Sequence, residues 1–109
     1  MDEASEYENR IAELVTSADP DIRAQGIELA VSLGSPTVRL HQIAEAARAE
    51  WRAASAREAA LTVKEARKPS TSERLRIRAE EVEAYTRAEA AEEALRSYLR
   101  EAQEVSHDA

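Results

Sequence analysis

The sequence predicts an all-α protein in which two short N-terminal helices pack on a long antiparallel helical hairpin. Two observations lead to this fold class. The chain of 109 residues contains only two glycines and three prolines, and each proline lies at a predicted helix boundary. Between these boundaries, apolar side chains recur at spacings of three and four residues, the period of an amphipathic helix. We therefore expect a single domain over residues 1–109, a four-helix cluster with a coiled-coil-like arm.

The first helix is predicted over residues 5–17. Ser5 and Glu8 have the spacing of a capping box, in which the two side chains bond to each other's backbone N–H groups at a helix start. The buried stripe of this helix is predicted to be Tyr7, Ile11, Leu14 and Val15.

The second helix is predicted over residues 20–33, because Asp19 fits the N-cap, Pro20 the first helical position and Gly34 the C-terminal stop. Its shared face comprises Ile22, Gly26, Leu29, Ala30 and Leu33. A glycine inside a helix costs roughly 1 kcal/mol relative to alanine. We therefore expect another backbone to pass close to Gly26.

The third helix is predicted over residues 36–68, with Ser35 as N-cap and Pro36 at its first position. Arg67 and Lys68 suit the negative end of the helix dipole, and Pro69 ends the helix. Its apolar stripe consists of Leu40, Ile43, Ala47, Trp51, Ala54 and Leu61.

A fourth helix is predicted over residues 71–104, opened by the capping box Ser70 and Glu73 and followed by a disordered tail at 105–109. If it folds back on the third helix, position i meets roughly position 140 minus i. Trp51 then lies opposite residues 88–91, and Tyr85 opposite residues 53–56. Because alanine contributes little burial, the middle of this hairpin needs a further helix or a second chain to cover it.

Charge is unevenly distributed along the chain, whose formal net charge is −7. Counted from the sequence, residues 1–35 carry −6, residues 36–78 carry +5 and residues 79–109 carry −6. The acidic total argues against a generic nucleic-acid coat, which needs clustered Lys and Arg. The positive charge is densest at the predicted hairpin tip, at Lys64, Arg67, Lys68, Arg74, Arg76 and Arg78. This basic tip is expected either to contact nucleic-acid phosphate or an acidic protein surface, or only to keep a turn soluble.

Two local resemblances concern the second and third helices. Residues 19–34 resemble one helix of a HEAT-type repeat, but a single copy implies no function. Residues 29–34 followed by Thr37-Val38-Arg39 are similar to the bacterial helix-turn-helix pattern, although the turn is shorter and the second helix much longer than in that family. The resemblance implies a nucleic-acid face of Thr37, Arg39, His41, Gln42 and Arg48; the alternative is an ordinary corner between two helices.

Chemistry is sparse in this sequence. The chain has no cysteine and too few glycines for a phosphate-binding loop. Glu104 and His107 have the spacing of one half of a helical di-iron site, but no second copy exists, and His41 with Glu45 fits a surface hydrogen bond better than a cation site. The acidic groups near residues 80–93 are expected to form ion pairs within their own helix. We therefore expect no catalytic residue, no cofactor, no metal and no enzymatic activity.

The sequence leaves two functional hypotheses. The first is a non-enzymatic protein–protein interaction module that self-associates, as an adaptor, regulator or assembly factor, with itself as a homodimer or another protein as partner. Trp51 is either packed within it or an exposed anchor for a partner. The alternative is a nucleic-acid-binding regulator that uses the basic tip or a degenerate helix-turn-helix at residues 29–48. We expect a cytoplasmic location, no membrane partner and no small-molecule substrate.

Overall fold

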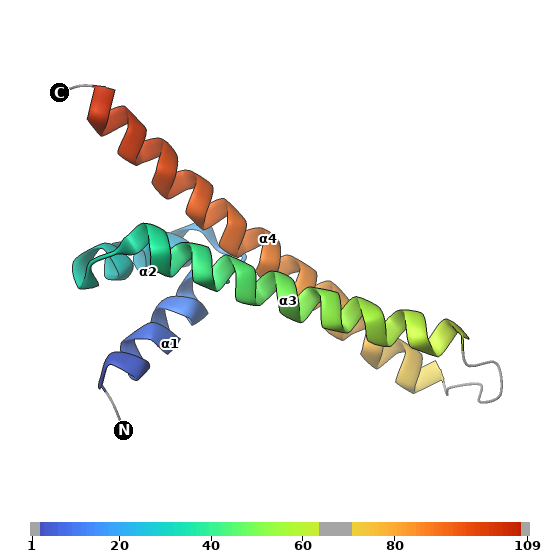
Figure 1. Cartoon of the computed structure of the whole chain (residues 1–109). Coiled ribbons are helices and arrows are strands. Elements are labelled where there is room, and N and C mark those ends of the chain that lie inside the picture. The colour runs from blue at the N-terminus through green and yellow to red at the C-terminus, as the bar shows by residue number, and fades with distance from the viewer. Residues whose placement is uncertain (1–2, 64–70, 108–109) are drawn as a thin grey trace.

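The computed structural model describes residues 3–63 and 71–107 of the chain, and the side chains of residues 6–60 and 71–104. The described residues form four helices: α1 (Glu3–Val15), α2 (Pro20–Leu33), α3 (Pro36–Val63) and α4 (Thr71–His107). Figure 1 shows α3 and α4 running alongside each other in opposite directions, with α1 and α2 packed near the N-terminus of α3. The predicted all-α fold, with two short helices on a long antiparallel hairpin, is confirmed.

The helix boundaries follow the sequence signals closely, with two exceptions. α2 has the predicted bounds, but α1 spans Glu3–Val15 rather than residues 5–17, so Ser5 lies inside the helix and does not mark its start. α4 continues to His107, into the segment that we expected to be a tail, because no glycine or proline interrupts it. Residues 64–70 and 108–109, which include Pro69 as the predicted end of the third helix and Ser70 as the predicted cap of the fourth, lie outside the described residues.

Local chemistry explains why α2 starts and stops where it does. The Asp19 carboxylate accepts a hydrogen bond of 2.9 Å from the backbone N–H of Asp21, as an N-cap side chain should. At the other end, Gly34 has φ 88° and ψ 161°, a conformation that only glycine adopts readily, and Ser35 follows with φ 51°. These two residues turn the chain from α2 into α3, and the Ser35 carbonyl accepts the first α3 hydrogen bond, from Arg39.

All four helices contribute to one aliphatic core at one end of the molecule. This end, called the base below, consists of α1, α2, residues 36–43 of α3 and residues 92–104 of α4. Its buried side chains are Ile11, Val15, Ala30, Leu40 and Ala94. Ile43, Leu95 and Tyr98 pack against them, so large side chains of α3 and α4 meet at this end of the hairpin. The prediction for Tyr7 was wrong: its side chain is 49% exposed, because α1 contacts α2 mainly through its later turns and projects away from α3 (Figure 1).

Gly26 is the point of closest approach between α1 and α2. A Cβ atom built on it would lie 2.7 Å from Val15 Cγ1, 2.8 Å from Leu14 Cβ and 3.0 Å from the Val15 backbone nitrogen. These distances are shorter than a carbon atom can occupy without displacing α1. The predicted close backbone neighbour is confirmed, and it explains a glycine in the middle of α2.

Beyond the base, α3 and α4 continue as a two-helix arm, defined here as residues 44–60 and 71–91. The side chains along the α3–α4 seam recur at alternating spacings of four and three, the heptad pattern of coiled coils. On α3 the buried or half-buried seam residues are Leu40, Ala44, Ala47, Trp51, Ala54 and Glu58. On α4 they are Ile77, Glu81, Ala84, Ala88, Ala91, Leu95 and Tyr98. The seam of the arm is therefore built mostly from alanine.

Contacts across the seam define the register of the hairpin. Arg48 pairs with Glu92, the partner that the predicted register gives it. Trp51 packs against the cluster of Ala44, Ala47, Ala88 and Ala91, but its ring also contacts Tyr85 at a centroid distance of 5.2 Å. The ring contact is one helical turn closer to the N-terminus of α4 than predicted, so two aromatic rings meet there rather than an aromatic ring and alanine.

The molecule is elongated, with extents of 63 × 36 × 21 Å and a Cα radius of gyration of 17.3 Å. A compact domain of this length has a radius of gyration of about 13 Å. The accessible surface is 8025 Å², whereas a compact monomer of 12.1 kDa exposes about 6,000 Å². The fold thus leaves about 2,000 Å² more surface exposed than a globular chain of equal mass.

Candidate interaction surfaces

A groove of about 210 Å³ lies between α1 and α3. It forms because α1 packs on α2 and projects away from α3. Its apolar lining comes from Ile11, Ala12, Ile43, Ala46 and Ala47, and its polar lining from Glu8, Thr16, Arg39, Gln42, Glu50 and Arg87. Sequence reasoning missed this groove, because no local pattern indicates the angle at which α1 leaves the hairpin.

A second surface is an exposed apolar stripe along the arm. Leu75, Val82 and Tyr85 on α4 are 64%, 58% and 46% exposed. Their spacings of seven and three residues place them on one side of the helix. The sequence contains this spacing, but it also contains the apolar spacing of the seam on the same helix, and the sequence alone does not say which of the two faces α3. We call these three residues the α4 stripe.

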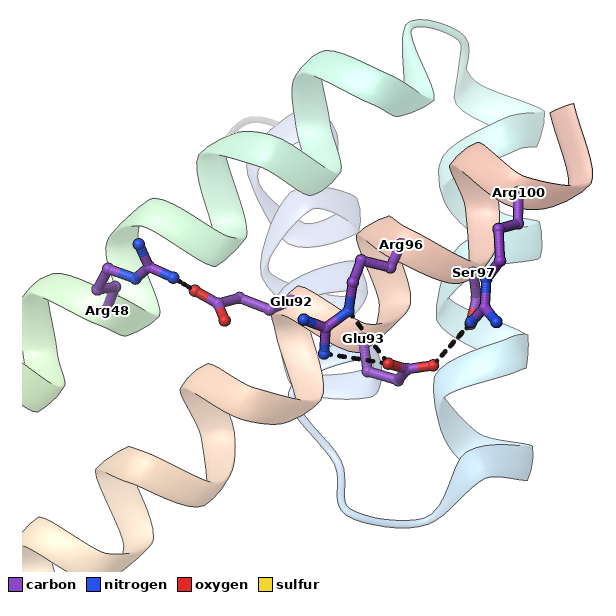
Figure 2. Close-up of polar contacts among 6 residues, drawn as sticks. All are labelled: Arg48, Glu92, Glu93, Arg96, Ser97 and Arg100. Carbon is purple, nitrogen blue, oxygen red and sulfur yellow. Dashed lines mark hydrogen bonds and ion pairs between the residues drawn. The ribbon is translucent and has the colours of Figure 1, made fainter. Parts of the chain in front are cut away.

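Polar contacts bind α4 both to α3 and to itself, as Figure 2 shows. Arg48 of α3 pairs with Glu92 of α4 (Figure 2). Nearer the tip, the Ser55 hydroxyl donates a 2.9 Å hydrogen bond to Glu81. We predicted that the acidic groups near residues 80–93 form ion pairs within their own helix. For Glu81 and Glu92 this was wrong, because both point across the seam to α3.

Glu93 pairs within α4, as predicted. Its carboxylate accepts hydrogen bonds from Arg96 at 3.1 and 3.2 Å, from Ser97 at 3.3 Å and from Arg100 at 3.0 Å (Figure 2). The hydrogen bonds from Arg96 are the main reason that the pKa of Glu93 lies below its ordinary value of 4.5. Desolvation acts in the opposite direction and raises the pKa. The charge of Arg96, the Ser97 hydrogen bond and the charge of Arg100 lower it further. This cluster therefore stays ionised at neutral pH.

The structure describes only half of the predicted basic tip. Arg74, Arg76 and Arg78 are exposed in the first turns of α4, and no carboxylate lies within ion-pair distance of them among the described residues. Lys64, Arg67 and Lys68 fall in the segment outside the described residues. Proximity between the two halves of the tip therefore stays a prediction.

The five residues of the predicted nucleic-acid face lie along α3, and three of them already have partners. Arg39 donates to Glu8 at 3.0 Å and to the Gly34 carbonyl at 2.9 Å. His41 contacts Glu45 at 3.2 Å, the surface pair that its spacing predicted. Arg48 pairs with Glu92, whereas Thr37 and Gln42 are exposed. The positive charge of this face is therefore largely neutralised within the molecule.

Trp51 is half-buried, packed on the alanine cluster on one side and on Tyr85 on another, so part of its surface stays accessible.

Within the described ranges, no group of three or more His, Cys, Asp or Glu residues has the arrangement of a metal site. None of the described helices combines the length and the apolar character needed to cross a membrane.

Comparison of the chain with protein-family models, with curated proteins and with solved structures finds no match in any of the three.

Proposed function

We propose that this chain is a non-enzymatic helical interaction module that self-associates through the arm of its hairpin, in the role of an adaptor, regulator or assembly factor. The observation that carries the proposal is the α4 stripe, which lies open on an arm whose own seam is mostly alanine. An alanine seam buries little apolar area, so two helices alone gain little from pairing. Covering the arm with another chain adds the missing burial.

The amount of exposed surface supports the same proposal. The excess of about 2,000 Å² over a compact monomer exceeds the roughly 800 Å² that each partner buries in a protein–protein interface of standard size. The stripe also joins two aliphatic side chains to an aromatic one, which is the kind of anchor that interfaces favour. The partner we propose is a second copy of this chain, which gives a homodimer.

Analytical ultracentrifugation tests this proposal directly. Sedimentation equilibrium from low to high micromolar concentration is expected to show a reversible monomer–dimer equilibrium at moderate salt. The chain has only one Trp and three Tyr, so absorbance near 230 nm, where peptide bonds absorb, extends the range to low concentration. A stable monomer throughout the range contradicts self-association.

A second candidate function is nucleic-acid binding at the basic tip. Its support is that Arg74, Arg76 and Arg78 are exposed and without a carboxylate partner within the described part of the chain, so their charge is available to phosphate. The helix-turn-helix face is a weaker basis, since Arg39 and Arg48 already pair with carboxylates.

Fluorescence anisotropy with labelled single-stranded and double-stranded DNA and RNA tests the second candidate. Binding is expected at low salt and is expected to weaken steeply as salt rises, because each phosphate contact releases a counterion. A variant with Arg67, Lys68, Arg74 and Arg76 changed to Glu is expected to lose it. Arg10→Glu, a charge reversal on α1, is the control that should bind as the parent chain does. Absence of binding at low salt contradicts this candidate.

A further inference from the structure

We infer that the second copy docks antiparallel along the open side of α4, with the two-fold axis near Val82. This inference rests on the proposed self-association and deepens it, because it assigns the residues that touch and the orientation of the two copies. It follows from the way α4 divides its surface, from the exposure of the α4 stripe and from the order of charges along the helix.

α4 presents three sides, two of which are occupied. The side with Ala84, Ala88 and Ala91 faces α3, and the side with Ala90 and Ala94, in the later part of the helix, is buried where the base helices pack. At 3.6 residues per turn, positions 75, 78, 82, 85 and 89 fall within an arc of about 80° on the third side. Within the described chain, this side has neighbours only at its later positions, where Tyr85 contacts Trp51 and Glu89 lies beside Ala18 and Arg23. Leu75 and Val82, earlier on the same side, are 64% and 58% exposed.

The third side has the pattern of a helix-pairing surface. Its residues in order are Leu75, Arg78, Val82, Tyr85 and Glu89, spaced alternately by three and four residues. The aliphatic and aromatic members are the α4 stripe, which is exposed along three helical turns. When a second copy is reversed about Val82, these positions fall opposite one another: position 75 faces position 89, position 78 faces position 85 or 86, and Val82 faces its own copy.

Charge along α4 selects the antiparallel orientation. Residues 71–78 contain Glu73 and three arginines, a net charge of +2, whereas residues 80–93 contain six glutamates and one arginine, a net charge of −5. In a parallel pair, like charges face each other along the whole contact. In an antiparallel pair, the basic first turns of one copy lie against the acidic middle of the other. The isologous arrangement is also the commonest symmetry of homodimers.

The antiparallel orientation also determines which residues of the two copies meet. With the axis near Val82, this residue meets its own copy, and Arg78 lies over Tyr85 of the second copy, a cation–π arrangement. The overlap from residue 75 to residue 89 is about 21 Å at 1.5 Å per residue. In this arrangement the contact involves the arms, and the two bases lie at opposite ends of the dimer.

Cysteine cross-linking tests the surface, since the chain contains no cysteine of its own. A disulfide requires Cα atoms within about 7 Å, so only a residue near the axis can join its own copy. Val82→Cys is therefore expected to give a covalent dimer on mild oxidation with copper–phenanthroline. Val38→Cys is the matched control, because Val38 is 56% exposed and Val82 58%. Val38 lies at the base, so the Val38→Cys chain is expected to form no covalent dimer.

The orientation is tested by a pair of variants. Leu75→Cys alone is expected to give no disulfide dimer, because in the antiparallel pair the two copies of this position lie far apart. A mixture of Leu75→Cys and Glu89→Cys chains, one of them carrying a mass tag, is expected to give the heterodimer. If Leu75→Cys alone cross-links as efficiently as Val82→Cys, the pair is parallel and the inference is overturned.

Charge reversal supplies an independent measurement in the unmodified arm. Arg78→Glu is expected to weaken the dimer on the order of tenfold in sedimentation equilibrium. Arg57→Glu, which reverses an exposed arginine of α3, is expected to leave the dissociation constant within about twofold of the parent value, because it lies outside the assigned contact. Equal weakening by the two changes would indicate a general charge effect and overturn the assignment.

The outcomes separate this inference from the proposed function. A parent chain that stays monomeric in the ultracentrifuge removes both. A parent chain that dimerises, while Val82→Cys cross-links no better than Val38→Cys, leaves self-association standing and overturns the surface. Dimerisation with efficient cross-linking at Val82 and of the mixed Leu75 and Glu89 variants supports both.

Discussion

The base and the arm of this molecule are held together in different ways. At the base, four helices surround fully buried branched side chains such as Ile11, Val15 and Leu40. In the arm, two helices meet along alanines, and the larger side chains Leu75 and Val82 lie outside the seam. The difference shows that a heptad pattern brings two helices together, whereas the stability gained depends on how much apolar area the seam residues bury. The base has a buried aliphatic core, whereas the arm buries mostly alanine and leaves large apolar side chains exposed.

The strongest test of this comparison removes one leucine from each region. Leu40→Ala is expected to destabilise the fold by about 2–5 kcal/mol, because Leu40 is 1% exposed and its loss leaves a cavity. Leu75→Ala is expected to change stability by no more than about 0.5 kcal/mol. Urea denaturation followed by circular dichroism, at concentrations low enough to keep the chain monomeric, measures both. Similar losses at the two sites would mean that the arm is buried as deeply as the base.

The second test probes the tightest contact of the base. Gly26→Ala is expected to destabilise by about 1–3 kcal/mol, because the added methyl group meets the α1 backbone at Val15. The gain in helix propensity, about 1 kcal/mol, is too small to offset the clash. Ala24→Gly, at an exposed position of the same helix, is the control and is expected to cost about 1 kcal/mol. Thermal melts compare the two, and a stabilised Gly26→Ala variant would show that α1 can shift freely.

The third test concerns the ion pair where arm and base meet. A double-mutant cycle of Arg48→Ala and Glu92→Ala is expected to give a coupling energy of about 0.2–1 kcal/mol, since the arginine is half-exposed and the glutamate more buried. Denaturation of the four chains measures the coupling. A value near zero would mean that the alanine seam alone sets the register.

The smallest expected effect is the pH dependence of the Glu93 cluster. Because the folded pKa of Glu93 is lowered, its ionised form stabilises the fold above pH 4.5, and this contribution is lost as pH falls through the folded pKa. The stability difference between the parent chain and Glu93→Gln should therefore be constant near neutral pH and shrink below pH 4.5. A difference that persists unchanged in acid would indicate that the substituted amide disturbs packing rather than charge. Chemical denaturation at several pH values provides the measurement.

The sequence alone determined the features that depend on neighbours along the chain. Asp19 and Pro20 start α2, Gly34 ends it and Pro36 opens α3, since caps and stops act through bonds a few residues long. The close neighbour of Gly26 was also predictable, because only a packing requirement explains a glycine there.

Tertiary structure alone decided which sides of these helices meet. Tyr7 shares a stripe with Ile11 but stays exposed, since α1 leaves the hairpin at an angle that no local pattern indicates, and the groove beside α3 has the same origin. Glu81 and Glu92 bond across the seam because their partners on α3 come close only after the hairpin has formed. Helix periodicity reports that a face is apolar or charged, but the partner of that face depends on packing between residues far apart in the sequence.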